Sequence, residues 1–151
     1  MSFSTSDEPR LVKGGVSVDD RGFVAFVNDF DMAPVRRFYS VGNHRAGMVR
    51  AWHGHRHERK FMSVLHGSAL ACCVRIDDWE DPSPDLRVDR FVLSALTPAV
   101  LSIPAGFANG FMTLSEDALV TFFSTSTLEE SAADDIRFPA RLWDPWKIEE
   151  R

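Results

Sequence analysis

The chain has 151 residues, 44% of them hydrophobic, which suffices for the core of one ordinary domain and excludes a disordered chain. Its formal net charge of −5 argues against a generic nucleic-acid-binding protein, because phosphate backbones require a basic face. Any anionic ligand must therefore be held by individual arginines. We expect a single domain over residues 1–151, with a flexible segment at 1–10 and a C-terminal strap at 140–151.

Short apolar runs, interrupted by Gly, Pro, Asp or Asn, follow one another along the chain and are typical of β-strands. We predict strands over residues 22–30, 35–41, 47–53, 60–66, 68–76, 86–94, 99–104 and 118–126. A tight turn is expected at His66-Gly67, and an exposed acidic loop at 77–85. Residues 127–135 are predicted to form a polar turn. Many short strands at this spacing indicate an all-β sandwich or barrel.

The region Phe91–Ser115 contains no charged residue and is long enough to raise the possibility of a membrane span. Prolines and glycines interrupt it, so we predict buried strands instead and no membrane contact. The polar N-terminus predicts no signal peptide. The adjacent Cys72 and Cys73 would point to opposite faces of a strand, and we interpret them as buried thiols of a cytoplasmic protein.

The segment RAWHGHRHERK, residues 50–60, holds three histidines within five residues. Its spacing fits the first motif of the cupin superfamily, in which a glycine, a His-x-His pair, a glutamate and a second glycine recur at fixed intervals. The matching positions are Gly47, His53, His55, Lys60 and Gly67, with Lys60 in place of the glutamate. The second motif, Pro-x-Gly-x-x-His, is matched over residues 104–109, with Asn109 in place of the histidine.

A catalytic metal site of the cupin type requires imidazoles and a carboxylate. Because Lys60 and Asn109 occupy two of the four ligand positions, we expect no metal and no other cofactor. His57 would add an imidazole only if it shared the face of His53, and the residues after His55 are predicted to turn away. Three interpretations remain open: a metal site, a solvated histidine tip, and the favoured one, a metal-free pocket with acid–base chemistry.

A metal-free cupin with lysine at this position resembles the dTDP-4-dehydrorhamnose 3,5-epimerase family, over about residues 20–146. Residues 20–23 are similar to the family's N-terminal Arg-Gly signature, and residues 50–53 to its Arg-Gly-x-His segment. Residues 103–111 are similar to its Ile-Pro-x-Gly-Phe-Ala-His-Gly-Phe segment. The pair His53 and His55 also resembles the His-x-His of the related nucleotide-sugar 3,4-ketoisomerases, where the epimerases usually have His-x-Gln.

The resemblance implies a cupin jelly roll of two packed antiparallel sheets with very little helix. It also implies removal of a proton α to the ketone of a dTDP-4-keto-6-deoxyhexose, a step that needs a base near neutral pKa and a cation at the developing enolate. On the family's pattern His53 is the base and Lys60 the enolate stabiliser. The substrate-binding residues would be Arg21, Arg50, His55, Asn109 and Phe122. Arg21 would reach the neighbouring subunit's diphosphate, which implies a homodimer with exchanged N-terminal strands.

Two features depart from the family's pattern. The tyrosine expected in segment 122–128 as the acid on the opposite face of the sugar is absent, and the chain's single tyrosine, Tyr39, is either its replacement or an ordinary strand residue. The aspartate that pairs with the base also has no match, and Asp134, Asp135 and Asp144 all remain candidates. A 3,4-ketoisomerase, a 3-epimerase and a non-catalytic sugar-nucleotide-binding cupin are therefore the alternatives.

Overall fold

A computed structural model describes residues 7–151, so most of the segment predicted to be flexible, 1–10, lies outside the described residues. The strands are β1 (Arg10–Lys13), β2 (Gly15–Asp19), β3 (Gly22–Phe26), β4 (Arg37–Gly42), β5 (Val49–His55), β6 (Lys60–His66), β7 (Ser68–Arg75), β8 (Val88–Ser94), β9 (Ala99–Ile103), β10 (Phe107–Thr113), β11 (Leu119–Ser124) and β12 (Ile136–Arg137). One short helix, α1 (Leu128–Ala132), lies between β11 and β12.

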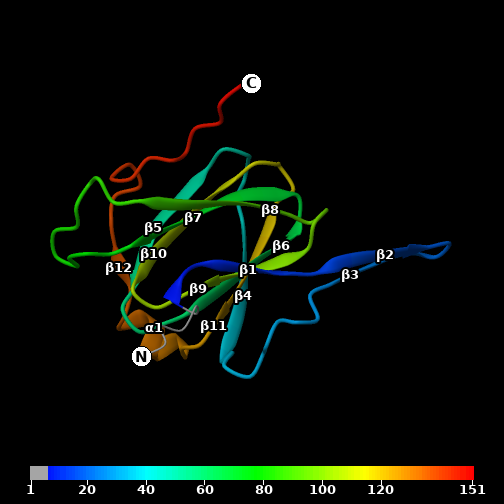
Figure 1. The fold of residues 1–151 in the computed structure, drawn as a ribbon, viewed down its shortest axis with the longest axis horizontal. Coiled ribbons are helices and arrows are strands. Elements are labelled where there is room, and N and C mark those ends of the chain that lie inside the picture. Colours follow the sequence, from blue (N-terminus) through cyan, green and yellow to red (C-terminus); the bar gives the residue numbers. More distant parts are fainter. Residues whose placement is uncertain (1–6) are drawn as a thin grey trace.

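Ten of the strands form two five-stranded antiparallel sheets, which lie against each other in Figure 1. The β6 sheet has the order β1-β9-β6-β11-β4, and the β10 sheet has the order β12-β5-β10-β7-β8. Consecutive strands alternate between the sheets in places, as in a jelly roll. The prediction of an all-β cupin jelly roll with two packed antiparallel sheets and very little helix is confirmed.

One apolar cluster lies between the two sheets, a second lies on the outer side of the β10 sheet, and β7 contributes to both. Its alternate residues Ala69, Ala71 and Cys73 face the core between the sheets, whereas Leu70, Cys72 and Val74 face the outer side of the β10 sheet. On that outer side the C-terminal residues Trp143 and Trp146 pack against Trp52, with ring centroids 5.5 and 5.1 Å away. Both faces of β7 are thus buried, and both cysteines are free thiols on opposite faces.

The hairpin of β2 and β3 extends away from the two sheets (Figure 1) and exposes apolar side chains. Val18, Phe23 and Val24 are 76%, 73% and 63% exposed. Such a projecting apolar surface is unusual for a monomer. Within residues 7–151 no helix is long and apolar enough to cross a membrane.

Several predicted strands agree with the structure, and β6 matches at both ends. The prediction missed β10, because the turn-forming pair Asn109-Gly110 lies in the middle of that strand, where the register with β5 shifts. Glycine is required at 110, since a Cβ there would lie 2.5 Å from the Cβ of Ala51. The prediction also missed β1, β2 and β12 and extended β3 four residues too far, to residue 30.

The polar-turn prediction for 127–135 is corrected by α1, a five-residue helix. Thr127 and Glu130 form a capping box, in which each side chain bonds the other's backbone N–H. The turn predicted at His66-Gly67 is present, and Gly67 has a positive φ of 66° that favours glycine.

Candidate active site

A cavity of about 190 Å³ lies between the sheets and gathers side chains from both of them. Tyr39, Lys60 and Phe122 come from the β6 sheet, and Arg50, His53 and Asn109 come from the β10 sheet. Val41 and Phe111 complete the lining. The structure thus brings together six of the eight residues that we expected in the site, and it does not bring Arg21 or His55 to this lining.

The wall formed by the β6 sheet carries a cation beside a phenol. The Lys60 ammonium donates to the Tyr39 hydroxyl at 2.5 Å, and the Lys60 side chain is largely buried. The register of β4 and β11 sets Tyr39 opposite Phe122, and their rings stack with centroids 5.3 Å apart. This wall can therefore offer both a positive charge and a proton donor to an oxygen or carbon atom in the cavity.

The opposite wall carries the imidazole of His53, and its partner is Asp135. Nδ1 of His53 lies 3.5 Å from Oδ1 of Asp135, at the long end of hydrogen-bond distances. Asp144 instead pairs with Arg141 at 2.9 Å. The structure thus favours Asp135 among the three candidate aspartates. A neutral His53 ring that donates its Nδ1–H to Asp135 carries its lone pair on Nε2, as a general base requires.

Burial chiefly sets the protonation of His53. Desolvation lowers the pKa of this imidazole below its ordinary value, and Asp135 partly offsets that effect. The positive charges of Arg137 and Lys60 lower the pKa further. Asp135 itself has a lowered pKa: its burial raises the value, but hydrogen bonds from Arg137 and His53 outweigh that effect. The pair therefore combines a neutral base with an ionised carboxylate near neutral pH.

Arg50 is held by a neutral partner. Its Nε donates to Oδ1 of Asn43 at 2.7 Å, and Asn43 is fixed in turn by bonds to Met48 and Thr113. Within residues 7–151 no carboxylate forms an ion pair with Arg50. Its terminal nitrogens remain available for an anion, for which the planar guanidinium fork is well suited.

Asn109 lies opposite His53 in the register of β10 and β5. Its side chain is 6% exposed, and its Nδ2 finds no hydrogen-bond partner among the described residues. A buried donor without a partner is destabilising by about 1–3 kcal/mol. Because Asn109 lines the cavity, a ligand oxygen is the natural acceptor for this donor.

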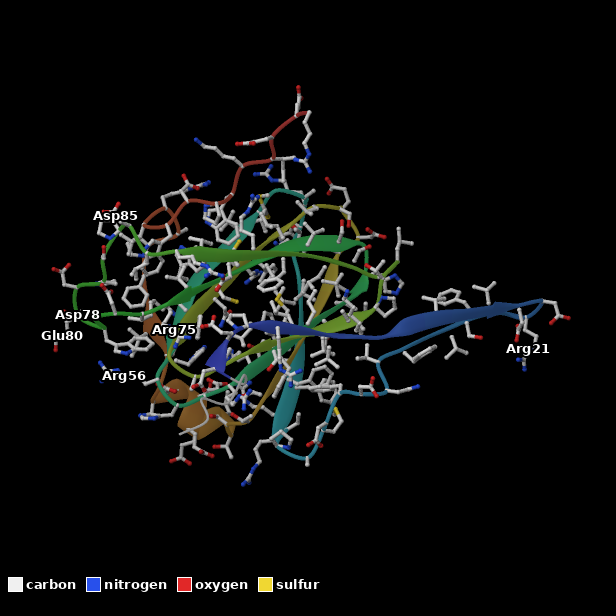
Figure 2. The ribbon with its side chains drawn as sticks, viewed as in Figure 1. Arg21, Arg56, Arg75, Asp78, Glu80 and Asp85 are labelled. Atoms are coloured by element: carbon white, nitrogen blue, oxygen red, sulfur yellow. The ribbon has the colours of Figure 1, made fainter. Side chains whose placement is uncertain are left out.

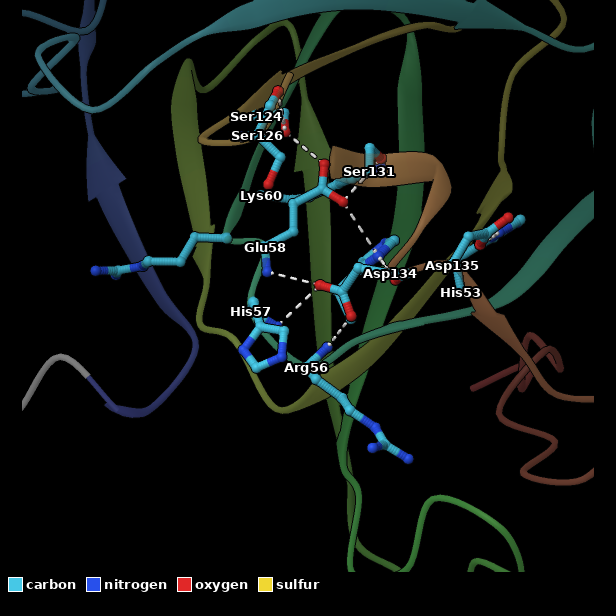
Figure 3. A network of polar contacts seen from close by, with 12 residues as sticks. His53, Arg56, His57, Glu58, Lys60, Ser124, Ser126, Ser131, Asp134 and Asp135 are labelled. Atoms are coloured by element: carbon cyan, nitrogen blue, oxygen red, sulfur yellow. Dashed lines mark hydrogen bonds and ion pairs between the residues drawn. The ribbon is translucent and has the colours of Figure 1, made fainter. Parts of the chain in front are cut away.

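His55 is buried and joins the polar network around Glu58 and Asp134 that Figure 3 shows. Its Nδ1 lies 2.8 Å from the carbonyl oxygen of Asp134 and 3.2 Å from Oε2 of Glu58. Since both neighbours are acceptors, Nδ1 carries the hydrogen. Sequence reasoning missed Glu58, whose only signal was a carboxylate within the histidine-rich segment. Its side chain is 0% exposed and accepts bonds from Arg37, Ser124 and Ser131.

Arg21 lies at the tip of the projecting hairpin, remote from the cavity of the same chain (Figure 2). Its side chain is 86% exposed and pairs with Asp19 at 2.6 Å. Among the described residues no group of three His, Cys, Asp or Glu side chains is arranged to hold a metal ion. The expected absence of a metal in solution stays a prediction.

Comparison with known proteins decides the family. The family model described as dTDP-4-dehydrorhamnose 3,5-epimerase matches residues 10–143. The chain belongs to this family. The predicted family and its class of enzyme, an isomerase, are confirmed. A relative from Bacillus subtilis, described as spore coat polysaccharide biosynthesis protein SpsL, is 28% identical over 129 residues, which are 83% of this chain and 82% of that protein.

Two solved structures are similar in fold. The dTDP-4-dehydrorhamnose 3,5-epimerase of Bacillus anthracis, with TDP and PPi bound, has a TM-score of 0.76 and 21% identity over 99% of this chain and 90% of that chain. A double mutant of ChmJ, a 3'-monoepimerase from Streptomyces bikiniensis in complex with dTDP, has a TM-score of 0.77 and 17% identity over 97% of this chain and 78% of that chain.

Proposed function

We propose that the protein epimerises a dTDP-4-keto-6-deoxyhexose at C3 and C5, in the cytoplasm, as a step of deoxysugar or surface-polysaccharide synthesis. The observation that carries the proposal is the arrangement of the cavity. On the wall formed by one sheet, a histidine paired with a carboxylate faces the cavity. On the wall formed by the other sheet, a lysine bonded to a tyrosine faces it. A flat sugar ring between these walls would meet a base on one face and an acid on the other.

The proposed reaction follows from these positions. Nε2 of His53 takes the proton from the carbon next to the C4 ketone, and the electron pair moves into the enolate. The Lys60 ammonium stabilises the negative charge on the enolate oxygen. The Tyr39 hydroxyl then delivers a proton to the same carbon from the opposite face, so that the configuration inverts. The tyrosinate then recovers a proton from solvent, the His53 imidazolium releases its proton to solvent, and the same steps repeat at the second carbon.

Substrate binding would rest on the remaining donors. Arg50 offers terminal nitrogens to phosphate oxygens, and Asn109 offers its unpartnered Nδ2 to a sugar oxygen. We also propose a homodimer in which Arg21 enters the site of the other subunit. The length of the hairpin and its exposed apolar residues Val18 and Phe23 support this proposal, since pairing would cover them.

The ketoisomerase alternative rested on the pair His53 and His55 and on the absence of the family's tyrosine from segment 122–128. The burial of His55 and the hydrogen bond of its Nδ1 to the carbonyl oxygen of Asp134 weaken that alternative, because a second proton shuttle would need a ring at the cavity. The 3-epimerase and the non-catalytic binding protein remain outcomes of the test.

The test is incubation of dTDP-4-keto-6-deoxyglucose with the protein in heavy water, followed by NMR. Deuterium at both C3 and C5 with inversion supports the proposal, and deuterium at C3 alone indicates a 3-epimerase. A 3-keto product indicates a ketoisomerase, and no exchange leaves a binding protein. His53→Asn should abolish exchange while nucleotide affinity stays within a few-fold. His57→Asn, which alters an exposed histidine of the same segment, is the matched control and should change neither.

A further inference from the structure

Asp134 ties together two segments that lie far apart in the sequence. Its carboxylate accepts three consecutive backbone N–H bonds, from Arg56 at 2.8 Å and from His57 and Glu58 at 2.9 Å each. Its own carbonyl oxygen faces Nδ1 of His55 at 2.8 Å. Asp134, two residues beyond the end of α1, thereby closes the turn that follows β5, as Figure 3 shows. Three converging amides form a nest suited to an anion.

Glu58 joins the same two segments from the other side. Ser131, in α1, donates to Oε2 of Glu58 at 2.9 Å, and Ser124, at the end of β11, donates to Oε1. Arg37, from β4, supplies the opposite charge at 3.3 Å. Buried charges persist where partners and hydrogen bonds satisfy them, so this network fixes the segment 131–134 against residues 55–58.

Asp135 follows Asp134 directly, and its carboxylate is the one that faces His53. The pairing of β12 with β5, in which Ile136 lies opposite Gly54 and Arg137 lies opposite His53, continues the same attachment. The Asp135–His53 pair is itself long and partly exposed, with side chains 29% and 36% accessible. An ion pair this long and this exposed contributes little free energy, so it does not by itself fix the positions of its two side chains. Arg137 also donates to Asp135 at 3.1 Å, but its side chain is 71% exposed, so the geometry of the pair rests mainly on the neighbouring attachment.

We propose that Asp134 is a positioning residue, which holds Asp135 at Nδ1 of His53 by anchoring the chain to the amides of residues 56–58. The catalytic consequence rests on the proposed function, but the geometric consequence does not. Asp134 does not line the cavity, so in this proposal it acts through Asp135. The pKa of Asp134 agrees with this role: burial alone would raise it, but the three backbone N–H bonds outweigh burial and lower it, so the anchor is ionised.

The test compares Asp134→Asn with Asp135→Asn and with the double variant. The first readout is the NMR titration of His53, which requires no substrate. Because Asp135 raises the pKa of His53, both single variants should lower that pKa further, and in the same direction. The second readout is turnover, and Asp134→Asn should lower kcat roughly tenfold to a hundredfold with KM within about threefold.

The double variant separates positioning from a merely structural role. If Asp134 acts through Asp135, Asp134→Asn changes neither the His53 titration nor kcat further in the Asp135→Asn background. Glu129→Gln is the matched control, because it removes a carboxylate from exposed α1 and should leave both readouts unchanged. Should Asp134→Asn not fold, Ser131→Ala loosens the same attachment and should give smaller shifts in the same direction.

An unchanged His53 titration in Asp134→Asn, where Asp135→Asn does shift it, would overturn the proposal. Additive effects in the double variant would do the same. A shifted titration without any detectable turnover in the parent protein would retain the positioning role and refute only the proposed function.

Discussion

Replacement of Tyr39 by phenylalanine removes a single oxygen atom from the wall formed by the β6 sheet. The ring that stacks on Phe122 at 5.3 Å is retained, so we expect the fold to be retained as well. The lost bond is the donation from Lys60 at 2.5 Å, and a hydrogen bond to a charged group contributes about 1.5–3 kcal/mol. We expect a stability loss near the lower value, because water that enters the open cavity can solvate the ammonium.

The effect on catalysis should be larger and selective. A positioned general acid contributes about 10²–10⁴-fold in rate, which corresponds to about 3–5 kcal/mol in the barrier. Abstraction of the α-proton by His53 does not need the phenol, whereas delivery to the opposite face does. In Tyr39→Phe we therefore expect deuterium exchange within about tenfold of the parent protein, and inversion reduced by about 10²–10⁴-fold.

The assay follows both events in one sample, by NMR in heavy water: label that enters unreacted substrate, and label in inverted product. Ser40→Ala is the matched control, since Ser40 also lies on β4, is exposed and loses a bond to Thr121 at 3.0 Å. Undiminished inversion would refute the assignment and show that water or another side chain supplies the proton. Equal loss of exchange and inversion would mean that Tyr39 only orients Lys60.

Four further predictions follow from burial. Because desolvation lowers the pKa of His53, the acid limb of kcat/KM should lie below pH 6.5, and a limb above that value would contradict the burial argument. The unfolded chain binds this proton more readily, so His53 should make the protein less stable as the pH falls below about 6.5, and His53→Asn should reduce that dependence. Trp143→Ala should lower the free energy of unfolding by about 3–5 kcal/mol in urea titrations, since the side chain is 3% exposed and packs on Trp52; a loss under 1 kcal/mol would refute that packing. Burial raises the pKa of Cys72 to about 12 and that of Cys73 well above its ordinary value, so iodoacetamide at pH 8 should modify both only after denaturation, and rapid native labelling would contradict their burial.

Much of the fold could be predicted from the sequence because its determinants are local. Short runs rich in Val, Phe and Leu, ended by Gly and Pro, specify strands, and β6 was located to the residue. The strand period of two also explains why Cys72 and Cys73 face opposite sides. Local signals failed at Asn109-Gly110, because the close approach of Ala51 overrides the turn preference of that pair.

The cavity residues likewise divide into those that the sequence predicts and those that only the tertiary structure places. Motif spacing and family resemblance pointed to His53, Lys60 and Asn109, which lie on strands whose alternation the sequence carries. The position of Tyr39 beside Lys60 depends on the pairing of β4 with β11, and the sequence does not encode that register locally. The choice of Asp135 over its neighbour likewise depends on contacts between residues 82 positions apart. His55 had the same local pattern as His53, yet the approach of Asp134 and Glu58 buries it. The sequence by itself determined most of the strands of the two sheets, the family and the residue types of the site. Tertiary structure decided which carboxylate meets which imidazole, because that depends on the distance in space between segments that the sequence holds far apart.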